Sequence, residues 1–312
     1  MKRIGIKILF LGTVEFSRHC LDETLRLGGN VTEVLTLDEK KGLFNSDYAD
    51  LEPVAAQYGV PVRRIHNIND QETIHHIQRL EPDVIFVFGF SQLIKKEVLD
   101  IPNLGCIGTH PALLPKNRGR HPLTWALIDD LKESGLTFFY LDEGADSGDI
   151  LWQKKFFISD MDDAGTLYGK IKSLASEGIR EILPLLQAGN APRIKQDHSK
   201  ATYWRKRGEE DGEIDWNGTT RQAFNLIRGL CRPYVGAHTF AGKYKVIIWR
   251  SRIVEDPGEI PGYEHAMPGQ ILTAPDPGFF IRTGEGVLEV LDWGSEVNAR
   301  MGKGTILKGV KH

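Results

Sequence analysis

The first half of the chain alternates between short runs of consecutive apolar residues and longer stretches in which apolar residues recur every three or four positions. The short runs predict buried strands, and the longer stretches predict helices with one apolar face. Strands are predicted over residues 6–12, 30–37, 60–65, 82–90 and 105–110, and helices over residues 16–27, 50–58, 72–80 and 94–99. This alternation predicts an α/β domain built on an open, mostly parallel, doubly wound sheet. Residues 38–46, which are polar and contain glycine, are predicted as a loop.

The pattern changes toward the carboxyl end of the chain. Residues 136–156 predict a strand, a glycine-containing turn and a second strand, and residues 165–187 predict a long helix that closes the first domain. A helix over 220–230 precedes five short apolar runs, at 237–242, 244–254, 269–275, 278–284 and 286–294. Such closely spaced short strands predict a small open β-barrel of the OB type. We therefore predict a first domain at 1–192, a linker at 193–219 and an OB-like barrel domain at 220–312.

Composition restricts the class of protein. Hydrophobic residues make up 41% of the chain and charged residues 26%, as in soluble globular proteins. The apolar runs are far shorter than the roughly 20 residues that a membrane span needs, and the start "MKRIGIKILFLG" lacks a small-residue cleavage site, which favours a first strand over a signal peptide. A net charge of −3 argues against a general nucleic-acid surface. The three cysteines are widely spaced, so they predict no disulfide framework and no metal site, as is usual in the cytoplasm.

Polar residues gather where two predicted strands end. His110 follows an apolar strand, and Lys116, Arg118 and Arg120 come in the next loop. Asp146 lies in the glycine-containing turn "DEGADSGDI". Ligands of doubly wound sheets bind outside the carboxyl ends of the strands, and a histidine beside an aspartate is the minimum equipment for general acid–base chemistry. Each residue alone also fits a structural role, as a solvated histidine, a turn aspartate or an exposed loop.

Together these segments resemble a known family. "HPALLPKNRGRHPLTW" followed by "DEGADSGDI" is similar to the enzymes that use 10-formyltetrahydrofolate, which formylate methionyl-tRNA, glycinamide ribonucleotide or nucleotide-linked amino sugars. His110 and Asp146 are 36 positions apart (146 − 110), as in the family motif. The resemblance extends over nearly the whole chain and includes the text from "DGEIDW" onward, which resembles the start of the family's barrel domain. The basic loop and the linker look most like the formyltransferase that acts on UDP-linked 4-amino-4-deoxy-arabinose.

The resemblance implies a Rossmann-like formyltransferase domain, 10-formyltetrahydrofolate as co-substrate and no metal. It places His110 and Asp146 as catalytic residues, with Gly108 in the position of a family asparagine. The folate pocket would be formed by the end of the fourth predicted strand with the segment that follows it, and by the backbone of the acidic turn. Its residues would be Phe88, Gly89, Phe90, Leu93, Ile94, Glu143, Gly144 and Ala145. Phe88 and Phe90 also fit the core of a buried strand.

Gly108 departs from the family pattern. In the family the asparagine amide is thought to donate a hydrogen bond to the oxyanion, and losing such a donor costs about 10²–10³ in rate. Thr109 is expected to face away from positions 108 and 110, because strand side chains alternate. Asn117, a backbone N–H or a bound water are the candidate replacements. A folate- or sugar-binding protein with weak or no activity is the alternative that Gly108 suggests.

The acceptor is the remaining question. A nucleotide-linked amino sugar, formylated for a surface polysaccharide such as lipopolysaccharide or O-antigen, needs phosphate-binding and base-stacking groups. We predict Arg118 and Arg120 for the first role and Tyr203 and Trp204 for the second, with a solvated linker as the alternative for the aromatic pair. Methionyl-tRNA would require a basic insertion, and the candidate at 38–50 is rich in acids. The alternatives are therefore methionyl-tRNA formyltransferase and a formyl-folate hydrolase, and the exposed barrel is a candidate homodimer surface.

Overall fold

The computed structural model describes residues 5–38, 47–295 and 301–309. The chain forms two compact units. The first comprises Met1–Pro122, Glu133–Phe157 and Tyr168–Trp204, and the second comprises Leu123–Lys132, Ile158–Leu167 and Arg205–His312. The segment predicted as a linker is thus divided between the units after Trp204, while the predicted domain limits themselves stay a prediction. The predicted loop at 38–46 lies outside the described residues except for its first position.

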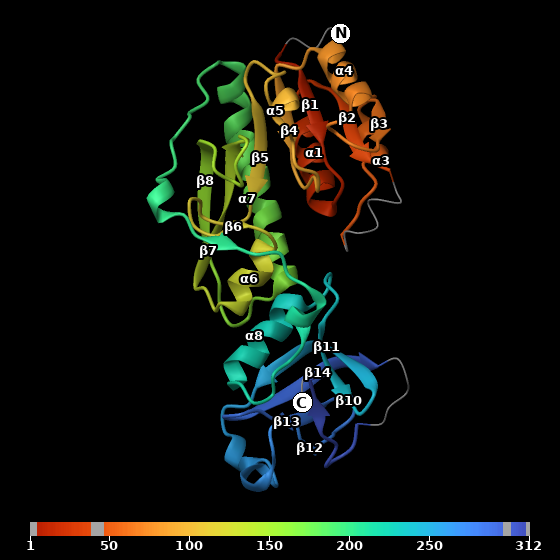
Figure 1. The fold of residues 1–312 in the computed structure, drawn as a ribbon, viewed down its shortest axis with the longest axis vertical. Helices are drawn as coiled ribbons and strands as arrows, with labels where there is room; N and C mark the ends of the chain where they lie inside the picture. The colour runs from red at the N-terminus through yellow and green to blue at the C-terminus, as the bar shows by residue number, and fades with distance from the viewer. Residues whose placement is uncertain (1–4, 39–46, 296–300, 310–312) are drawn as a thin grey trace. The chain divides into compact units, whose positions relative to one another are not determined.

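A seven-stranded sheet forms the centre of the first unit, in the order β3-β2-β1-β4-β5-β7-β8 (Figure 1). Its strands are β1 (Ile8–Leu11), β2 (Val31–Leu37), β3 (Val62–Ile65), β4 (Val84–Val87), β5 (Cys106–His110), β7 (Glu133–Tyr140) and β8 (Ile150–Phe157). The first five pair in parallel, and β7 pairs antiparallel with both β5 and β8. The predicted α/β class, a doubly wound and mostly parallel sheet, is confirmed.

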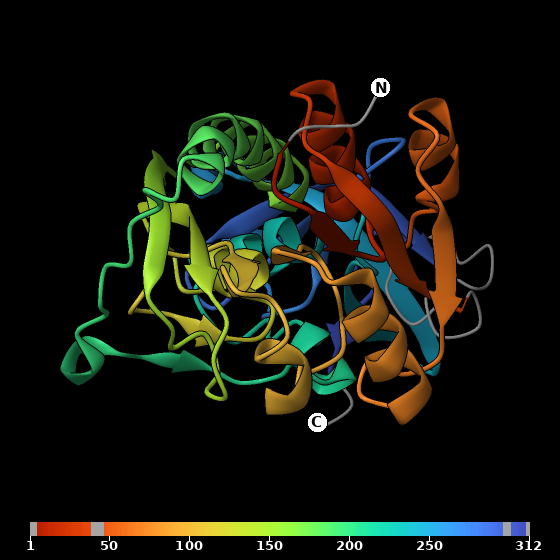
Figure 2. The ribbon, with the colours of Figure 1, turned by 90° about the horizontal axis from the view of Figure 1, so that it is seen from above.

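Helices cover both faces of this sheet. They are α1 (Glu15–Arg26), α3 (Glu52–Gln57), α4 (Gln71–Leu80), α5 (Lys96–Leu99) and α7 (Ala164–Gln187). Helix α6 (Pro122–Ile128) follows the basic loop and belongs to the second unit from Leu123 onward. Helices α1 and α7 lie side by side, because the His19 ring contacts the carbonyl of Lys172 and the hydroxyl of Ser176 at 2.9 and 2.8 Å. Helices α4 and α5 pack on the opposite face, against Leu9 and Leu11 of β1 (Figure 2). Alternate residues of one strand therefore enter two separate apolar layers.

The second unit is built on a six-stranded antiparallel sheet that follows helix α8 (Thr220–Leu230). Its strands are β10 (Ala237–Ala241), β11 (Tyr244–Ile253), β12 (Ile271–Thr273), β13 (Phe279–Arg282), β14 (Val287–Ser295) and β15 (Leu307–Lys308), in the order β12-β13-β14-β11-β10-β15. A bridge between Gln270 and Ile306 joins the two edges, so the sheet curls into the predicted small barrel. The two-residue β15 was not predicted, because it is too short to show a pattern.

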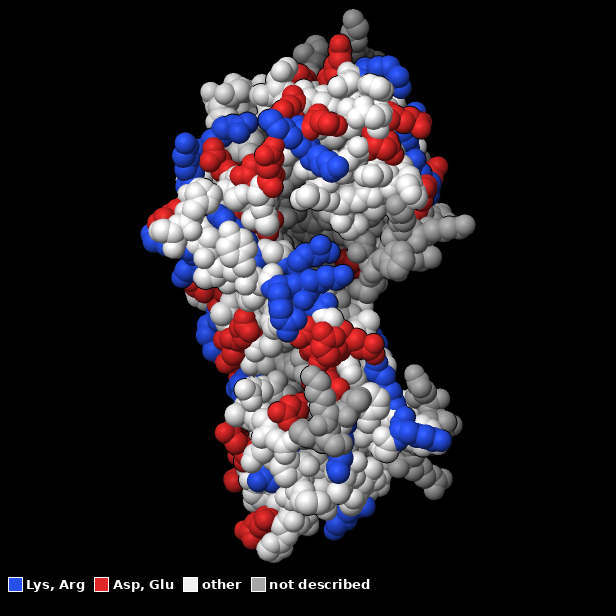
Figure 3. All heavy atoms as spheres, in the orientation of Figure 1, with Lys and Arg blue, Asp and Glu red and all other residues white. Residues whose placement is uncertain are grey.

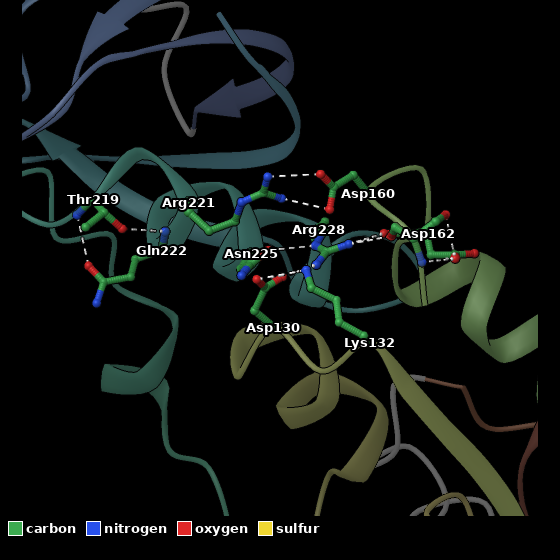
Figure 4. A network of polar contacts seen from close by, with 10 residues as sticks. Asp130, Lys132, Asp160, Asp162, Thr219, Arg221, Gln222, Asn225 and Arg228 are labelled. Carbon is green, nitrogen blue, oxygen red and sulfur yellow. Dashed lines mark hydrogen bonds and ion pairs between the residues drawn. The ribbon is translucent and has the colours of Figure 1, made fainter. Parts of the chain in front are cut away.

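A buried arginine explains why two segments from the middle of the chain belong to the second unit. Arg228 of α8 donates hydrogen bonds to Asn225 Oδ1 at 2.9 Å and to the carbonyls of Ser159 and Asp162 at 2.8 and 3.1 Å. Its guanidinium also lies 3.2 Å from the Asp130 carboxylate (Figure 4). Burial lowers the pKa of Arg228, and the neighbouring carboxylates oppose that shift. These contacts join residues that are distant in sequence, which a reading along the chain cannot detect.

Four short 3-10 helices complete the described elements. They are η1 (His198–Lys200), η2 (Glu209–Gly212), η3 (Pro257–Glu259) and η4 (Tyr263–His265). A separate two-stranded parallel ladder joins β6 (Arg118–Gly119) to β9 (Tyr203–Trp204). None of the described helices combines the length and the apolarity that crossing a bilayer would require.

Candidate active site

A cleft of about 620 Å³ opens at the carboxyl ends of the parallel strands of the first unit. Its walls come from the segment after β4, the end of β5, the loop after β6 and the turn between β7 and β8. Its lining includes Gly89, Phe90, Leu93, Ile94, Gly108, Arg120, Leu141, Gly144, Ala145 and Asp146. The strand order changes direction between β1 and β4, and doubly wound sheets bind their ligands at such a switch point.

His110 and Asp146 meet beside this cleft: Asp146 and Thr109 line it, and His110, the residue after Thr109, is not among the lining residues. His110 is the last residue of β5 and is 4% exposed, and its Nδ1 lies 3.5 Å from Asp146 Oδ2. The other ring nitrogen, Nε2, lies 2.7 Å from the carbonyl oxygen of Asn117. Because a carbonyl oxygen only accepts, Nε2 carries a proton and donates it, and Nδ1 is the nitrogen that faces the carboxylate. The two residues that the sequence placed together are therefore neighbours in the structure.

The turn that carries Asp146 is held by its own polar groups. Asp142 Oδ1 accepts hydrogen bonds from the backbone N–H of Gly144 at 3.0 Å and from the hydroxyl of Ser147 at 2.7 Å. Asp146 has a φ of 53°, a left-handed conformation that aspartate tolerates better than most residues. Its Oδ2 accepts a hydrogen bond from the backbone N–H of Gly119 at 2.8 Å. The carboxylate is thus fixed from the turn on one side and from the basic loop on the other.

Most residues predicted to bind folate line the cleft, but Phe88 does not. Gly89, Phe90, Leu93, Ile94, Gly144 and Ala145 are on its surface. Phe88 is fully buried and its ring packs against Phe10, Phe86 and Phe138 at centroid distances of 5.7, 4.9 and 5.3 Å. Its assignment to the folate pocket is wrong, because a side chain enclosed by the core has no surface for a ligand. Glu143 is exposed and is not among the cleft residues.

The residues predicted to bind the acceptor separate into two groups. Arg120 is exposed and lines the cleft, and its binding of the acceptor stays a prediction. Arg118 is 2% exposed and its guanidinium is bonded to Tyr203, Gln196 and His198, so its assignment to substrate phosphates is wrong. Tyr203 and Trp204 form β9 beside it and are not among the cleft residues. Strand β6 turns Arg118 inward and leaves Arg120 outside.

Leu141 occupies the space beside Gly108. A Cβ atom added at Gly108 would lie 2.5 Å from Leu141 Cδ2 and 3.2 Å from its Cγ. Asn117 does not replace the family asparagine, because its side-chain oxygen accepts a hydrogen bond from Thr202 at 3.1 Å and it is absent from the cleft lining. Thr109 borders the cleft, contrary to the expectation that it faces away. At the end of a strand, neighbouring residues on both faces reach the same opening.

Sequence reasoning missed three further residues of the site. Asp47 and Val14 line the cleft, and Asp47 accepts a hydrogen bond from the Tyr168 hydroxyl at 2.7 Å. No local pattern marks either residue, since their role depends on helix α7 reaching the loop after β2. Gln196, in the predicted linker, donates hydrogen bonds to the carbonyls of Asp146 and Gly148. A buried amide in a polar segment has no sequence signature.

Neither a metal site nor a cysteine nucleophile finds support in the described residues. These residues contain no group of three or more His, Cys, Asp or Glu side chains placed to hold a metal ion. Cys106, at the start of β5, is buried, and burial raises the pKa of its thiol to about 12. A thiol with that pKa stays protonated at neutral pH and is a poor nucleophile.

The chain thus combines a doubly wound sheet, which has a histidine–aspartate pair at the carboxyl end of β5, with a small barrel, and such a pair is suited to acid–base group transfer. Comparison with known proteins identifies the family. Residues 6–183 match the formyl transferase family model, and residues 207–311 match its C-terminal domain model. The chain is 34% identical over 318 residues to methionyl-tRNA formyltransferase of Caldanaerobacter subterraneus subsp. tengcongensis, covering 97% of this chain and 100% of that protein. The chain belongs to the formyltransferase family.

A further relative agrees on the family, and solved structures agree on the fold. Methionyl-tRNA formyltransferase of Syntrophus aciditrophicus is 35% identical over 308 residues, 98% of this chain and 96% of that protein. An N-formyltransferase from Helicobacter canadensis, solved with folinic acid and dTDP-3-aminofucose, superposes with a TM-score of 0.69 at 18% identity, covering 93% of this chain and 100% of that one. HypX from Aquifex aeolicus, solved with tetrahydrofolic acid, gives a TM-score of 0.67 at 17% identity, covering 94% of this chain and 45% of that chain.

Membership defines the reaction class. Enzymes of this family transfer formyl groups, and 10-formyltetrahydrofolate is their formyl donor. The protein is accordingly a formyltransferase, and its co-substrate is the one that the sequence motifs implied. The cleft fits such a group, because its wall after β4 presents the apolar Leu93 with 72% of its surface exposed. An apolar side chain at the mouth of a cleft provides surface for a flat, largely apolar ligand to cover.

Proposed function

We propose that this protein transfers the formyl group of 10-formyltetrahydrofolate to the amine of a nucleotide-linked amino sugar, for the synthesis of a surface polysaccharide. The observation that carries the chemistry is the pairing of His110 with Asp146, which lines the cleft, with Nδ1 and Oδ2 separated by 3.5 Å. An imidazole and a carboxylate in contact can accept a proton from an attacking amine and deliver one to a leaving nitrogen.

The proposed reaction is a direct transfer. The neutral amine attacks the formyl carbon and forms a C–N bond, which gives a tetrahedral intermediate with a negative oxygen. The amine proton passes to the His110–Asp146 pair, directly or through water. The bond between the formyl carbon and the folate nitrogen then breaks, and the pair returns a proton to that nitrogen. Holding the amine and the formyl group in contact supplies a large part of the acceleration.

Folate is assigned to the wall formed after β4 and by the acidic turn. Phe90, Leu93 and Ile94 offer apolar surface, and the backbone of Gly144 and Ala145 offers hydrogen-bonding groups at the opposite wall. The catalytic carboxylate of Asp146 comes directly after this turn. A donor bound here has its transferable carbon near the histidine–aspartate pair, as the reaction requires.

The acceptor is assigned to the side of the cleft that Arg120 lines. Arg120 is exposed at the cleft, next to Gly119, whose N–H holds the catalytic carboxylate. A guanidinium there suits a phosphate oxygen of a nucleotide carrier, because arginine binds phosphate with two parallel hydrogen bonds. One phosphate contact of this kind orients a small acceptor, whereas a nucleic-acid acceptor needs several.

Methionyl-tRNA is the second candidate acceptor, and the named relatives that match at 34 and 35% identity favour it. The charges of the structure are less favourable. Arg205 of the basic segment 205–207 is paired with Asp211, with one bond of 2.7 Å, and Lys245 is paired with Glu209 at 2.6 Å. Figure 3 shows acidic and basic side chains interspersed, with the largest group of basic side chains adjoining an acidic group. Neutralised arginines contribute little to phosphate binding.

The acceptor is tested by following the release of tetrahydrofolate from 10-formyltetrahydrofolate. The purified protein is incubated with UDP-, GDP- and dTDP-linked amino sugars, with charged initiator tRNA, or with no acceptor. Release with an amino sugar, together with a mass gain of one formyl group on that sugar, supports the proposal. Release only with charged tRNA transfers the assignment to the methionyl-tRNA enzyme, and release without acceptor identifies a hydrolase. Folate binding without release in any mixture identifies an inactive binding protein.

We expect Gly108→Asn to raise turnover only when Leu141 is shortened. In the parent, the new Cβ atom would lie 2.5 Å from Leu141 Cδ2, so the amide cannot take the family position unless that side chain moves. With Leu141→Ala the slot is open, and one additional oxyanion donor should raise kcat by about 10²-fold over Leu141→Ala alone. The measurement is kcat for both single variants, the double variant and the parent. Strictly additive effects in this cycle would show that the slot is not used for the oxyanion.

A further inference from the structure

We propose that Gln196 and Arg118 are positioning residues, which hold His110 and Asp146 in their reactive arrangement through the segment Gln196–Trp204. This inference rests on the assignment of the His110–Asp146 pair in the proposed function and adds to it. The segment was predicted as part of a linker, and the structure makes it a wall behind the catalytic residues. All of the contacts below lie within the first compact unit.

The backbone of the basic loop contacts both catalytic side chains. Asn117 offers its carbonyl oxygen to His110 Nε2 at 2.7 Å, and Gly119 donates its N–H to Asp146 Oδ2 at 2.8 Å. These two residues are separated only by Arg118. The position of this three-residue stretch therefore sets the distance and orientation between the imidazole and the carboxylate.

The same stretch is fastened to the segment Gln196–Trp204. The N–H of Arg118 donates to the carbonyl of Thr202 at 2.9 Å, and the N–H of Arg120 donates to the carbonyl of Trp204 at 3.2 Å. The N–H of Asn117 donates to the hydroxyl of Thr202 at 2.8 Å. The parallel ladder of β6 and β9 thus ties the loop to a segment about 80 residues later, as the separation between Arg118 and Tyr203 shows (203 − 118 = 85).

Gln196 joins this ladder to the turn of Asp146. It is 6% exposed, and its side-chain amide nitrogen donates to the carbonyls of Asp146 and Gly148 at 2.9 and 2.7 Å. Its amide oxygen accepts from Arg118 Nη2 at 2.7 Å. Because the guanidinium only donates and the carbonyls only accept, the orientation of this amide is fixed. One side chain therefore connects the turn that carries the carboxylate with the loop that holds the imidazole.

Arg118 is buried among uncharged partners. In the part of the chain that the structure describes, its guanidinium donates to Tyr203 Oη at 2.9 Å, to Gln196 Oε1 and to His198 Nδ1 at 3.0 Å, and its Nε has no partner. Burying a cation without a carboxylate partner is costly for stability. The role that we propose explains this cost, because the buried Arg118 guanidinium joins the segment Gln196–Trp204 to the loop that holds His110 and Asp146 in place.

The decisive variant is Gln196→Glu. The carboxylate keeps the size of the side chain and pairs with the Arg118 guanidinium, but it no longer donates to Asp146 and Gly148. We expect kcat to fall about 10- to 100-fold, since small displacements of reacting groups have effects of this size, while KM for the folate stays near that of the parent. The melting temperature should fall, because a buried carboxylate oxygen would face two carbonyl oxygens that have lost their donor. Lys200→Ala is the matched control, because Lys200 lies on the same segment, 69% exposed, and pairs only with Asp197 among the described ion pairs.

A second variant and a second readout keep the test decisive. Thr202→Val removes an exposed hydroxyl that makes two hydrogen bonds with Asn117, and because that hydroxyl is exposed we expect this variant to fold. It should lower kcat about fivefold, which corresponds to about 1 kcal/mol. The ring ¹⁵N and ¹H shifts of His110, assigned with His110→Asn, should change in both variants and not in Lys200→Ala. If Gln196→Glu folds and shows parental kcat and parental His110 shifts, the proposal is overturned. If Gln196→Glu does not fold, the same result for Thr202→Val overturns it.

The catalytic assignment is checked separately. If His110→Asn keeps parental turnover, the pair itself is wrongly assigned, and the failure belongs to the proposed function. If His110→Asn is inactive while the folded Gln196 and Thr202 variants turn over normally, only the positioning role fails. The His110 shifts need no acceptor, so this readout remains valid before the acceptor is identified.

Discussion

Replacement of His110 by asparagine is expected to lower kcat by about 10³-fold, within the range that general acid–base groups contribute. Asparagine is shorter than histidine and its amide nitrogen corresponds to Nδ1, so the variant keeps a polar group beside Asp146 but loses the 2.7 Å hydrogen bond from Nε2 to the Asn117 carbonyl. It cannot exchange a proton with the attacking amine or with the folate nitrogen. The measurement is kcat and KM at saturating acceptor, with the binding constant for tetrahydrofolate determined separately.

The control for this change is His75→Asn. His75 is exposed on α4, a helix that packs against the opposite side of the sheet from α1 and α7, and it has no place in the cleft. Its variant should match the parent in kcat and in melting temperature. If His110→Asn lost less than tenfold in kcat while binding folate normally, proton transfer would have to be assigned to another group.

Gly148→Ala is expected to lose both stability and turnover. A Cβ atom at Gly148 would lie 1.8 Å from the carbonyl oxygen of Tyr140 and 2.9 Å from its carbonyl carbon. Both atoms belong to backbone of β7, so the turn rather than a side chain has to move. We expect a loss of about 3 kcal/mol in the free energy of unfolding, at the upper end for overpacked sites. Asp146 lies two residues earlier, and its displacement from His110 should lower kcat as well.

Gly169→Ala provides the matched control. Gly169 lies inside α7, where an added Cβ atom meets nothing within 4 Å. Alanine in a helix interior is more stable than glycine by about 0.5–1 kcal/mol, so this variant should gain stability and keep kcat. Chemical denaturation and steady-state rates measure both effects. Equal behaviour of the two alanine variants would contradict the close approach at Gly148.

Much of the fold follows from local pattern. The apolar runs place β1, β2, β4 and β5, and the spacing of Phe16, Cys20, Leu21 and Leu25 places the buried face of α1. The runs ended later than the strands: the run at 82–90 contains β4 only over Val84–Val87. An apolar residue after a strand can enter the core, as Phe88 does, or line the cleft, as Phe90 does. The spacing of apolar residues along the chain does not by itself distinguish a core position from a cleft position.

The contact between His110 and Asp146 was predictable because their spacing belongs to a family motif, whereas the neighbours of this pair were not predictable. The sequence shows three positive charges in the basic loop, but only the fold buries Arg118 at 2% exposure and leaves Arg120 in the cleft. Whether a charged side chain binds a ligand or the protein depends on which later segment packs beside it. Here that segment is β9, whose pairing with β6 no local signal predicts.

The sequence by itself determined the class of fold, the reaction family and the pairing of His110 with Asp146, because periodicity and motif spacing can be read directly along the chain. Only the tertiary structure decided that Leu141 fills the space beside Gly108, that Phe88 belongs to the core, and that Gln196 joins the two catalytic loops. Each of these facts is a contact between residues distant along the chain, and such contacts exist only after the chain has folded.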